Sequence, residues 1–183
     1  MEKKYKTIKS SMVIINELML PSHSNFSGKI HGGYILSLLD QVAFACASKH
    51  SGSYCVTASV DTVDFLNPIE IGELVTMKAS VNYVGKSSII VGIRVEAENI
   101  QTGAVKHCNS SYFTMVAKDN EGKNVQVPGI IITEYEEIKR FYKSLKRMAL
   151  RKERNHHEEN FDFKSDIALK NLENYNVKLD IVK

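Results

Sequence analysis

The sequence is poor in several features that mark special classes of protein. Its 183 residues include three prolines, three cysteines and no tryptophan. The cysteines, Cys46, Cys55 and Cys108, fit no metal-ligand spacing, and an odd number in apolar surroundings predicts reduced, buried thiols. We therefore predict neither a metal site nor a disulfide-stabilised secreted fold.

The chain also lacks a strong charge bias and a long apolar run, and we expect no leader. Its net charge of +3 does not by itself predict a nucleic-acid partner. The first ten residues are rich in lysine and have no apolar core like that of a signal peptide. The most apolar stretch, residues 34–47, is too short for a membrane span and contains Ser37, Asp40 and Gln41. We expect a cytoplasmic protein without stable membrane insertion.

That apolar stretch predicts a buried helix. The helix is expected from about Gly33 to Lys49, and Ser51-Gly52 provides a usual stop. Because it is apolar nearly all round, other structure should surround it. Asp40 would then lie in a dry interior, where a carboxylate is costly unless it is paired or hydrogen-bonded. Carboxylates of this kind are typical of functional sites.

Strand signals flank the predicted helix. A β-branched run at residues 12–18 precedes it, and alternating segments follow at residues 55–66, 74–84, 87–98 and 105–117. One face of the segment 74–84 carries Val75, Met77, Ala79, Val81 and Tyr83. Short polar connections predict an antiparallel meander after the helix. The expected fold class is α+β, with an antiparallel sheet of five or six strands wrapped around one long central helix.

The sequence changes character near Pro128-Gly129. Residues 133–136 have the form of a capping box, and apolar residues then recur at helical spacing among many Lys and Arg. We divide the chain into a domain at residues 10–130 and a basic amphipathic helical C-terminal extension at residues 131–183. Its apolar stripe should dock on the domain or on another subunit; a membrane surface or nucleic acid is the alternative. We interpret the polar run 156–159 as solvated, although two histidines and two glutamates suit a metal.

Three polar features surround the start of the predicted helix. Asn25 lies in a polar loop, His31-Gly32-Gly33 opens the helix, and Asp40 lies about two turns into it. Free N–H groups and close approach at Gly32 and Gly33 suit an oxyanion. Asp40 would activate a water or attack directly, while Asn25 positions the water or the carbonyl. The alternatives are that Asp40 bonds only Ser37 or the backbone and that Asn25 is a turn residue.

Helix geometry restricts this site. Asp40 lies about 10 Å along the helix from Gly33, at a rise of about 1.5 Å per residue. One helix therefore cannot easily bring both its carboxylate and its N-terminus to one carbonyl group. Two antiparallel helices from two subunits can, so we expect an active site at a dimer interface.

A small motif, residues 85–88, lies between two strand segments. Its members are Gly85, Lys86, Ser87 and Ser88. A cation and hydroxyl groups suit a phosphate or a pantetheine amide, and an ordinary hairpin turn is the alternative. The spacing excludes a P-loop, and no helix follows.

Residues 20–40 resemble the hotdog-fold acyl-CoA thioesterases, and most of all the cytosolic acyl-CoA hydrolase group. The resemblance continues through residues 56–68, 85–88 and 98–104, and it covers about residues 10 to 130. It implies a hotdog fold, dimers with a continuous sheet, often three dimers in a hexamer, and active sites between subunits. Many relatives have Phe where His31 stands, which argues against an essential role for His31, and others have Arg in place of Asn67.

The resemblance also implies roles for particular residues. Asp40 corresponds to the catalytic carboxylate, Asn25 to a loop residue that acts from the other subunit, and Gly32-Gly33 to the oxyanion N–H groups. The motif 85–88 corresponds to a loop that approaches coenzyme A. Further candidates for substrate contact are His31 and Thr57.

The implied function is hydrolysis of acyl-CoA to free fatty acid and CoA, with no cofactor beyond the CoA of the substrate. Two other classes stay open. One is an acyl-CoA-binding sensor without turnover, since a fold does not fix a function. The other is a hydratase or dehydratase that uses His31, for which the arrangement from Gly32-Gly33 to Asp40 is a poor match.

Overall fold

A computed structural model describes residues 4–160 and, beyond them, Ser165, Lys170, Leu172, Tyr175 and Val177. It contains two compact units, Met1–Ser144 and Leu145–Lys183, and each is described by itself. The division at residue 130 stays a prediction. None of the helices in the described ranges is long and apolar enough to cross a membrane.

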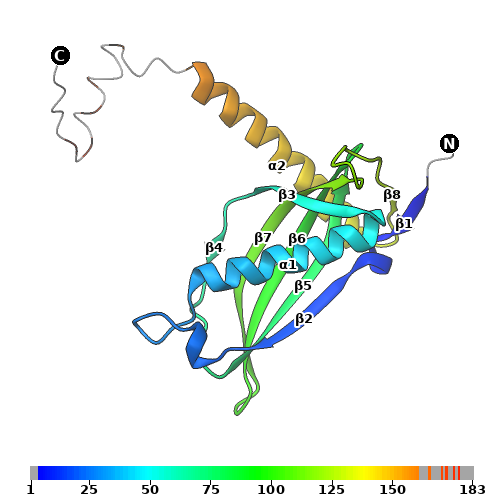
Figure 1. The fold of residues 1–183 in the computed structure, drawn as a ribbon. Helices are drawn as coiled ribbons and strands as arrows, with labels where there is room; N and C mark the ends of the chain where they lie inside the picture. Colours follow the sequence, from blue (N-terminus) through cyan, green and yellow to red (C-terminus); the bar gives the residue numbers. More distant parts are fainter. Residues whose placement is uncertain are drawn as a thin grey trace. The chain divides into compact units, whose positions relative to one another are not determined.

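The first unit is built on a six-stranded, curled antiparallel sheet (Figure 1). Its strands are β2 (Val13–Leu18), β3 (Tyr54–Val60), β4 (Asp64–Phe65), β5 (Glu73–Val84), β6 (Ser88–Asn99) and β7 (Ala104–Lys118). The order is β2-β5-β6-β7-β3, and β4 also pairs with β7. The meander prediction holds for β5 to β7 but is wrong for β3, which lies beside β7. The helix between β2 and β3 connects opposite edges of the sheet.

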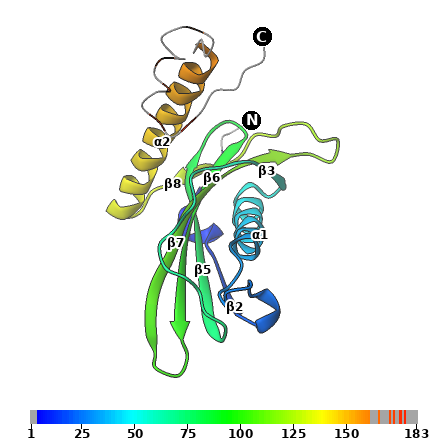
Figure 2. The same ribbon diagram turned by 90° about the vertical axis from the view of Figure 1, so that its left-hand side faces the viewer.

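Helix α1 (Gly32–Ser51) lies in the concave face of this sheet, as predicted (Figures 1 and 2). It ends at Gly52, whose φ of 72° is in the left-handed region that favours glycine. Its buried side chains are Ile35, Leu39, Val42, Ala43, Cys46, Ala47 and His50. They recur every three or four positions, and each fully buried Leu, Ile or Val contributes about 1.5–3 kcal/mol.

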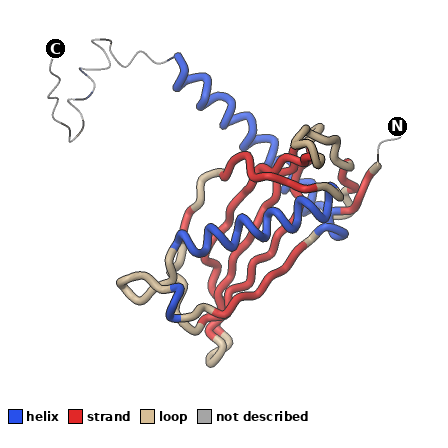
Figure 3. The backbone as a smooth tube through the Cα atoms, viewed as in Figure 1, coloured by secondary structure: helices blue, strands red, loops and turns tan. Residues whose placement is uncertain are grey.

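The other side of α1 is open in the single chain, contrary to expectation. Leu36, Asp40 and Phe44 follow one another at a spacing of four, and all three are exposed. The prediction that Asp40 is buried is therefore wrong for the isolated chain. The strands lie behind the helix, on one side of it (Figure 3), and residues four apart on the opposite side share its open face.

Strand β5 buries the side chains that were predicted to share one face, with one exception. Val75, Met77, Ala79 and Val81 are buried in the core, but Tyr83 is not part of it. The register of β5 against β6 shifts between Val81 and Tyr83, and a bulge moves the following side chain to the other face. The ring of Tyr83 lies 5.3 Å from that of Phe141 in the second helix.

Two short strands outside the main sheet were not predicted. β1 (Tyr5–Thr7) pairs in parallel with β8 (Gly129–Ile131), and the 3-10 helices η1 (Ile8–Ser11) and η2 (Pro21–His23) flank β2. Strands of three residues are too short for periodicity to show in the sequence. They fasten the chain before β2 to the segment before the second helix.

His50 joins this region to the end of α1. Its Nδ1 lies 3.2 Å from Ser11 Oγ and its Nε2 lies 3.1 Å from the carbonyl oxygen of Pro128. The Pro128 carbonyl can only accept, so Nε2 donates to it, and Nδ1 of the neutral ring is an acceptor that faces the Ser11 hydroxyl. The same hydroxyl also lies 3.1 Å from the Ile8 carbonyl oxygen, to which it can donate. Burial lowers the pKa of His50, and the nearby Lys6 cation acts in the same direction.

Helix α2 (Tyr135–Asn160) begins with a cap that differs from the predicted one. Glu137, rather than Glu136, turns back to the helix start: its Oε2 accepts from the N–H groups of Thr133 at 2.6 Å and Glu134 at 3.2 Å. Glu136 instead pairs with cations one turn later. The side chains of the polar run 156–159 lie outside the described residues.

The three cysteines are free and buried, as predicted. Burial raises the pKa of Cys46 to about 12 and also raises that of Cys108. Neutral thiols of this kind pack as small apolar side chains and are unreactive.

Candidate active site

Asp40 of α1 meets Thr57 of β3. The Thr57 hydroxyl donates to Asp40 Oδ1 at 2.5 Å, while Met115 Sδ lies 3.4 Å from the same hydroxyl oxygen. A hydroxyl has one proton, and a carboxylate is a much better acceptor than a thioether. The bond fixes the carboxylate through one oxygen and leaves Oδ2 to accept a proton. The Ser37 alternative is therefore not the arrangement that forms.

An open pocket lies directly beside this pair. Its lining residues are Asp40, Gln41, Phe44, Tyr54, Cys55, Val56, Thr57 and Met115. The rings of Phe44 and Tyr54 lie 5.4 Å apart in a tilted contact. The pocket thus offers a small apolar group a place next to a carboxylate. Sequence analysis missed both aromatic residues, although Phe44, one helical turn after Asp40, belongs to the same face.

Asn25 is the organising residue of the loop before α1. Its Oδ1 accepts from Ser27 N–H at 2.9 Å, Ser27 Oγ at 2.7 Å and Lys29 N–H at 3.1 Å. Gly28 closes this turn with a φ of 77°. The amide oxygen is thus engaged within the loop, and a ligand could use only the NH₂ group of Asn25 as a donor. The turn interpretation and the functional one are thus compatible.

The start of α1 presents backbone donors. His31 is the N-cap residue and makes no side-chain cap bond, so the first N–H groups, those of Gly32 and Gly33, have no acceptor within the helix. A Cβ added at Gly33 would meet nothing within 4 Å, whereas one at Gly32 would lie 3.4 Å from the ring of Phe65. The helix start is therefore accessible beside Phe65, with positive dipole charge directed outward. The His31 side chain is exposed there.

One chain does not bring these groups together. The lining of the Asp40 pocket includes neither Asn25 nor Gly32 and Gly33. Large apolar side chains are exposed near the Asp40 pocket and near the start of α1. The most exposed of them is Phe26, in the Asn25 loop, which is fully exposed. Exposed large apolar side chains are typical of interaction surfaces when they form a continuous patch.

The motif at residues 85–88 is a hairpin turn between β5 and β6. Gly85 N–H donates to the Ser88 carbonyl at 2.8 Å, and a Cβ at Gly85 would lie 2.6 Å from Ser88 Oγ. The carbonyls of Lys86 and Ser87 accept from Val127 and Ala117. The turn is thus rigid, with the Lys86 side chain exposed, and its contact with CoA stays a prediction.

Comparison with known proteins yields consistent matches. A sequence profile of the Thioesterase superfamily matches residues 27–104. The Helicobacter pylori protein VdlD is 42% identical over 145 residues, which are 79% of this chain and 83% of VdlD. The uncharacterized acyl-CoA thioester hydrolase YkhA of Bacillus subtilis is 35% identical over 149 residues, 81% of this chain and 87% of its own.

Solved structures agree with these matches. A hexameric acyl-CoA thioesterase in its apo form has a TM-score of 0.81 and 34% identity, and the match covers 83% of this chain and 97% of that one. An acyl-CoA hydrolase from Staphylococcus aureus, solved with butyryl-CoA and CoA, has a TM-score of 0.78 and 32% identity over 85% and 94% of the two chains.

Alanine variants of the Staphylococcus aureus enzyme have also been solved, at an asparagine, an aspartate and a threonine. Those three positions are separated by 15 and then 17 residues. Asn25, Asp40 and Thr57 have the same two spacings.

Proposed function

This chain belongs to the hotdog-fold acyl-CoA thioesterases, and we propose that it hydrolyses acyl-CoA thioesters to a free acid and coenzyme A. The observation that carries the proposal is the carboxylate of Asp40, held by Thr57 beside an apolar pocket. An acyl chain fits the apolar wall of the pocket, and the reacting carbonyl then lies next to the carboxylate. The related acyl-CoA hydrolases support this substrate class.

We propose Asp40 as the general base. Its Oδ2 takes a proton from a water, and the water oxygen attacks the thioester carbonyl carbon. The carbonyl oxygen becomes negative, and the N–H groups of Gly32 and Gly33 donate to it. When the intermediate collapses, the C–S bond breaks and the sulfur leaves with the proton that Asp40 had taken. Direct attack by Asp40, through an acyl-carboxylate anhydride that water then hydrolyses, is the alternative route.

The two halves of the site would come from two subunits. Asp40 and Thr57 of one subunit would face the Asn25 loop and the helix start of the other, because the helix rise places these groups about 10 Å apart within one chain. The exposed Phe26 in that loop supports a contact with a second copy. Asn25 would act through its NH₂ group, which donates to the carbonyl oxygen or to the attacking water.

We propose a dimer in which the β3 edges continue one sheet across both subunits, and three such dimers in a hexamer. The relatives described as hexameric support an oligomer. The exposed cation of Lys86, with Gly85, Ser87 and Ser88, is our candidate contact for the CoA phosphates.

A mixing experiment tests the shared site. Asp40→Asn and Asn25→Ala proteins, each expected to be nearly inactive, are co-expressed with different tags, and the mixed dimers are isolated. If the site is shared, each mixed dimer contains one intact pair and regains about half of the wild-type activity per dimer. If both groups work within one chain, the mixed dimers stay inactive.

The activity itself is measured with a panel of acyl-CoA chain lengths and a thiol reagent that detects released CoA. Tight binding of acyl-CoA without thiol release would instead favour the sensor function. Conversion of an enoyl-CoA without thiol release would favour the hydratase.

A further inference from the structure

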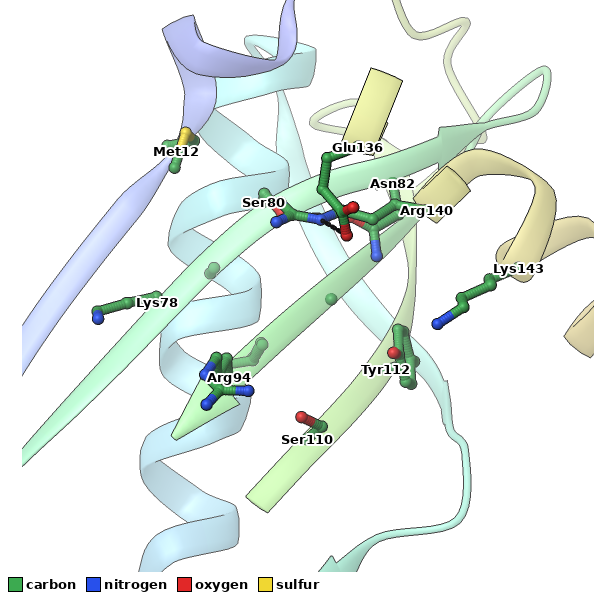
Figure 4. A pocket seen from close by; sticks show the side chains of 13 residues that line it. Met12, Lys78, Ser80, Asn82, Arg94, Ser110, Tyr112, Glu136, Arg140 and Lys143 are labelled. Carbon is green, nitrogen blue, oxygen red and sulfur yellow. Dashed lines mark hydrogen bonds and ion pairs between the residues drawn. The ribbon is translucent and has the colours of Figure 1, made fainter. Parts of the chain in front are cut away.

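A second pocket lies on the opposite face of the sheet from α1 (Figure 4). It has a volume of about 310 Å³ and is formed by β5, β6, β7 and the first turns of α2. Its basic lining residues are Lys78, Arg94, Arg140 and Lys143. They come from β5, β6 and α2, so no single local sequence motif predicts the pocket.

The floor of the pocket includes two buried polar side chains. Ser80 and Asn82 are 7% and 4% exposed, and the Ser80 hydroxyl donates to Asn82 Oδ1 at 3.2 Å. The Asn82 side chain lies directly over Gly92, where an added Cβ would be 2.3 Å from Asn82 Nδ2. Because the amide oxygen accepts from Ser80, its NH₂ group supplies donors at the floor. Gly92 is thus needed to let this polar floor form.

Two carboxylates hold the basic residues in place. Glu96 lies between Lys78, at 2.6 Å, and Arg94, at 2.7 Å. Their hydrogen bonds lower the pKa of Glu96 to about 2, so it is ionised at any functional pH. Glu136 is shared in the same way by Lys139, at 3.3 Å, and Arg140, at 3.7 Å.

The result is an excess of positive charge in a confined space. Each of the two carboxylates is divided between two cations, so each group of three side chains carries a net positive charge. The side chains of Lys78, Arg94 and Arg140 are about half exposed, so a solute can reach them. A cleft lined by one sign of charge concentrates ions of the other sign, and two arginines offer forked donors to phosphate or carboxylate groups.

We infer that this pocket binds a small anion that carries two or more phosphate or carboxylate groups, at a site separate from the Asp40 pocket. The basic side chains would grip the charged groups from the rim, and the Asn82 amide would donate from the floor. The competing interpretation is an ion-pair network that only fastens the start of α2 to the sheet.

Calorimetric titration of the full-length protein with inorganic pyrophosphate distinguishes the two interpretations. Arg94→Gln and Arg140→Gln should each weaken binding at least about tenfold, because each removes a hydrogen bond to a charged group. Glu96→Gln should strengthen binding, because it releases Lys78 and Arg94 to the ligand. The matched control Lys123→Gln breaks an exposed ion pair elsewhere and should leave binding unchanged.

A purely fastening network predicts a different pattern. All three pocket variants would then lower the melting temperature. Pyrophosphate would bind only weakly to the wild type, or equally to the wild type and to every variant, and either of these binding results overturns the proposal. Circular dichroism verifies that the variants fold. Titration with pyrophosphate in saturating CoA then distinguishes two sources of the natural anion. If CoA prevents pyrophosphate from binding, the pocket takes the phosphates of CoA itself; if both bind at once, it takes a separate anion.

Discussion

Carboxylates on the two faces of the sheet have different kinds of partner. On the outer face, Glu96 lies between two cations. On the inner face, Asp40 is held by the neutral hydroxyl of Thr57, and none of the ion pairs among the described residues involves it. A carboxylate between two cations is committed to holding them, whereas one held by a single hydroxyl keeps an oxygen for chemistry. The comparison separates a carboxylate suited to organising a site from one suited to reacting in it.

The two faces also differ in how much of each candidate site one chain contains. The outer pocket is complete within residues 12–143, with its floor and rim in one chain. The Asp40 pocket is open, and the helix start and the Asn25 loop lie outside its lining. The outer pocket needs no second chain to be complete, whereas our proposal for the Asp40 site requires one.

The largest effect should come from the inner carboxylate. Asp40→Asn keeps the shape of the side chain but removes the base, and we expect kcat to fall at least about 100-fold, as is typical of a general base. Turnover of butyryl-CoA measures this. The matched control is Glu121→Gln, an exposed carboxylate in a turn, which should keep full activity. Full turnover in Asp40→Asn would make the comparison between the faces meaningless.

The next effect concerns the NH₂ group of Asn25. Asn25→Asp preserves the oxygen that holds the loop and removes the donors, so we expect kcat to fall about 10- to 100-fold while the melting temperature is nearly kept. Asn25→Ala should lose both activity and loop order. If Asn25→Asp kept wild-type kcat, the loop would have only a structural role.

Removal of an aromatic side chain from the Asp40 pocket should change the selectivity for acyl-chain length. Phe44 and Tyr54 lie between the Asp40 pocket and a neighbouring pocket that both residues also line. Phe44→Ala should join the two and raise kcat/KM for longer chains relative to butyryl-CoA about tenfold, within the range per methylene for an apolar pocket. An unchanged chain-length profile in an active variant would place the acyl chain elsewhere.

Removal of the Thr57 hydroxyl should have a smaller effect. Thr57→Val deletes the bond that orients Asp40, and we expect kcat to fall about tenfold with little change in KM. Thr57→Ser restores the hydroxyl and should recover most of the activity. Failure of the serine variant to recover it would mean that the methyl group, and not the hydrogen bond, matters.

The smallest effect concerns His50, near the C-terminal end of α1. Its pKa is lowered in the folded state, so the unfolded chain binds the proton more tightly. The stabilisation is complete above the unfolded pKa of about 6.5 and is lost as the pH falls below it. The wild-type melting temperature should therefore decrease between pH 7.5 and pH 5.5 more than that of His50→Gln. Equal decreases would contradict this assignment.

Much of the fold follows from local pattern. The apolar run and its glycine stop predict α1, and the alternation in β5 predicts its buried face as far as Val81, because side chains on a helix or strand repeat with a fixed period. The resemblance of residues 20–40 also led to Asn25, Gly32-Gly33 and Asp40. The role of the motif 85–88 and the division at residue 130 stay predictions.

Other features depended on contacts that no local pattern contains. Tyr83 was placed on the wrong face because one bulge reverses the alternation beyond it. The cap of α2 shifted by one residue to Glu137, and Asp40 was expected to be buried although the sheet covers only one side of its helix.

The sequence by itself determined which side chains share a face of each helix and strand, since that depends only on backbone periodicity. Only the tertiary structure decided which faces meet. It joined Thr57 to Asp40 across 17 positions and assembled the outer pocket from three strands and a helix. The physical reason is that such pairings are set by strand order, register and the crossing of helix over sheet, which arise from the packing of the whole core.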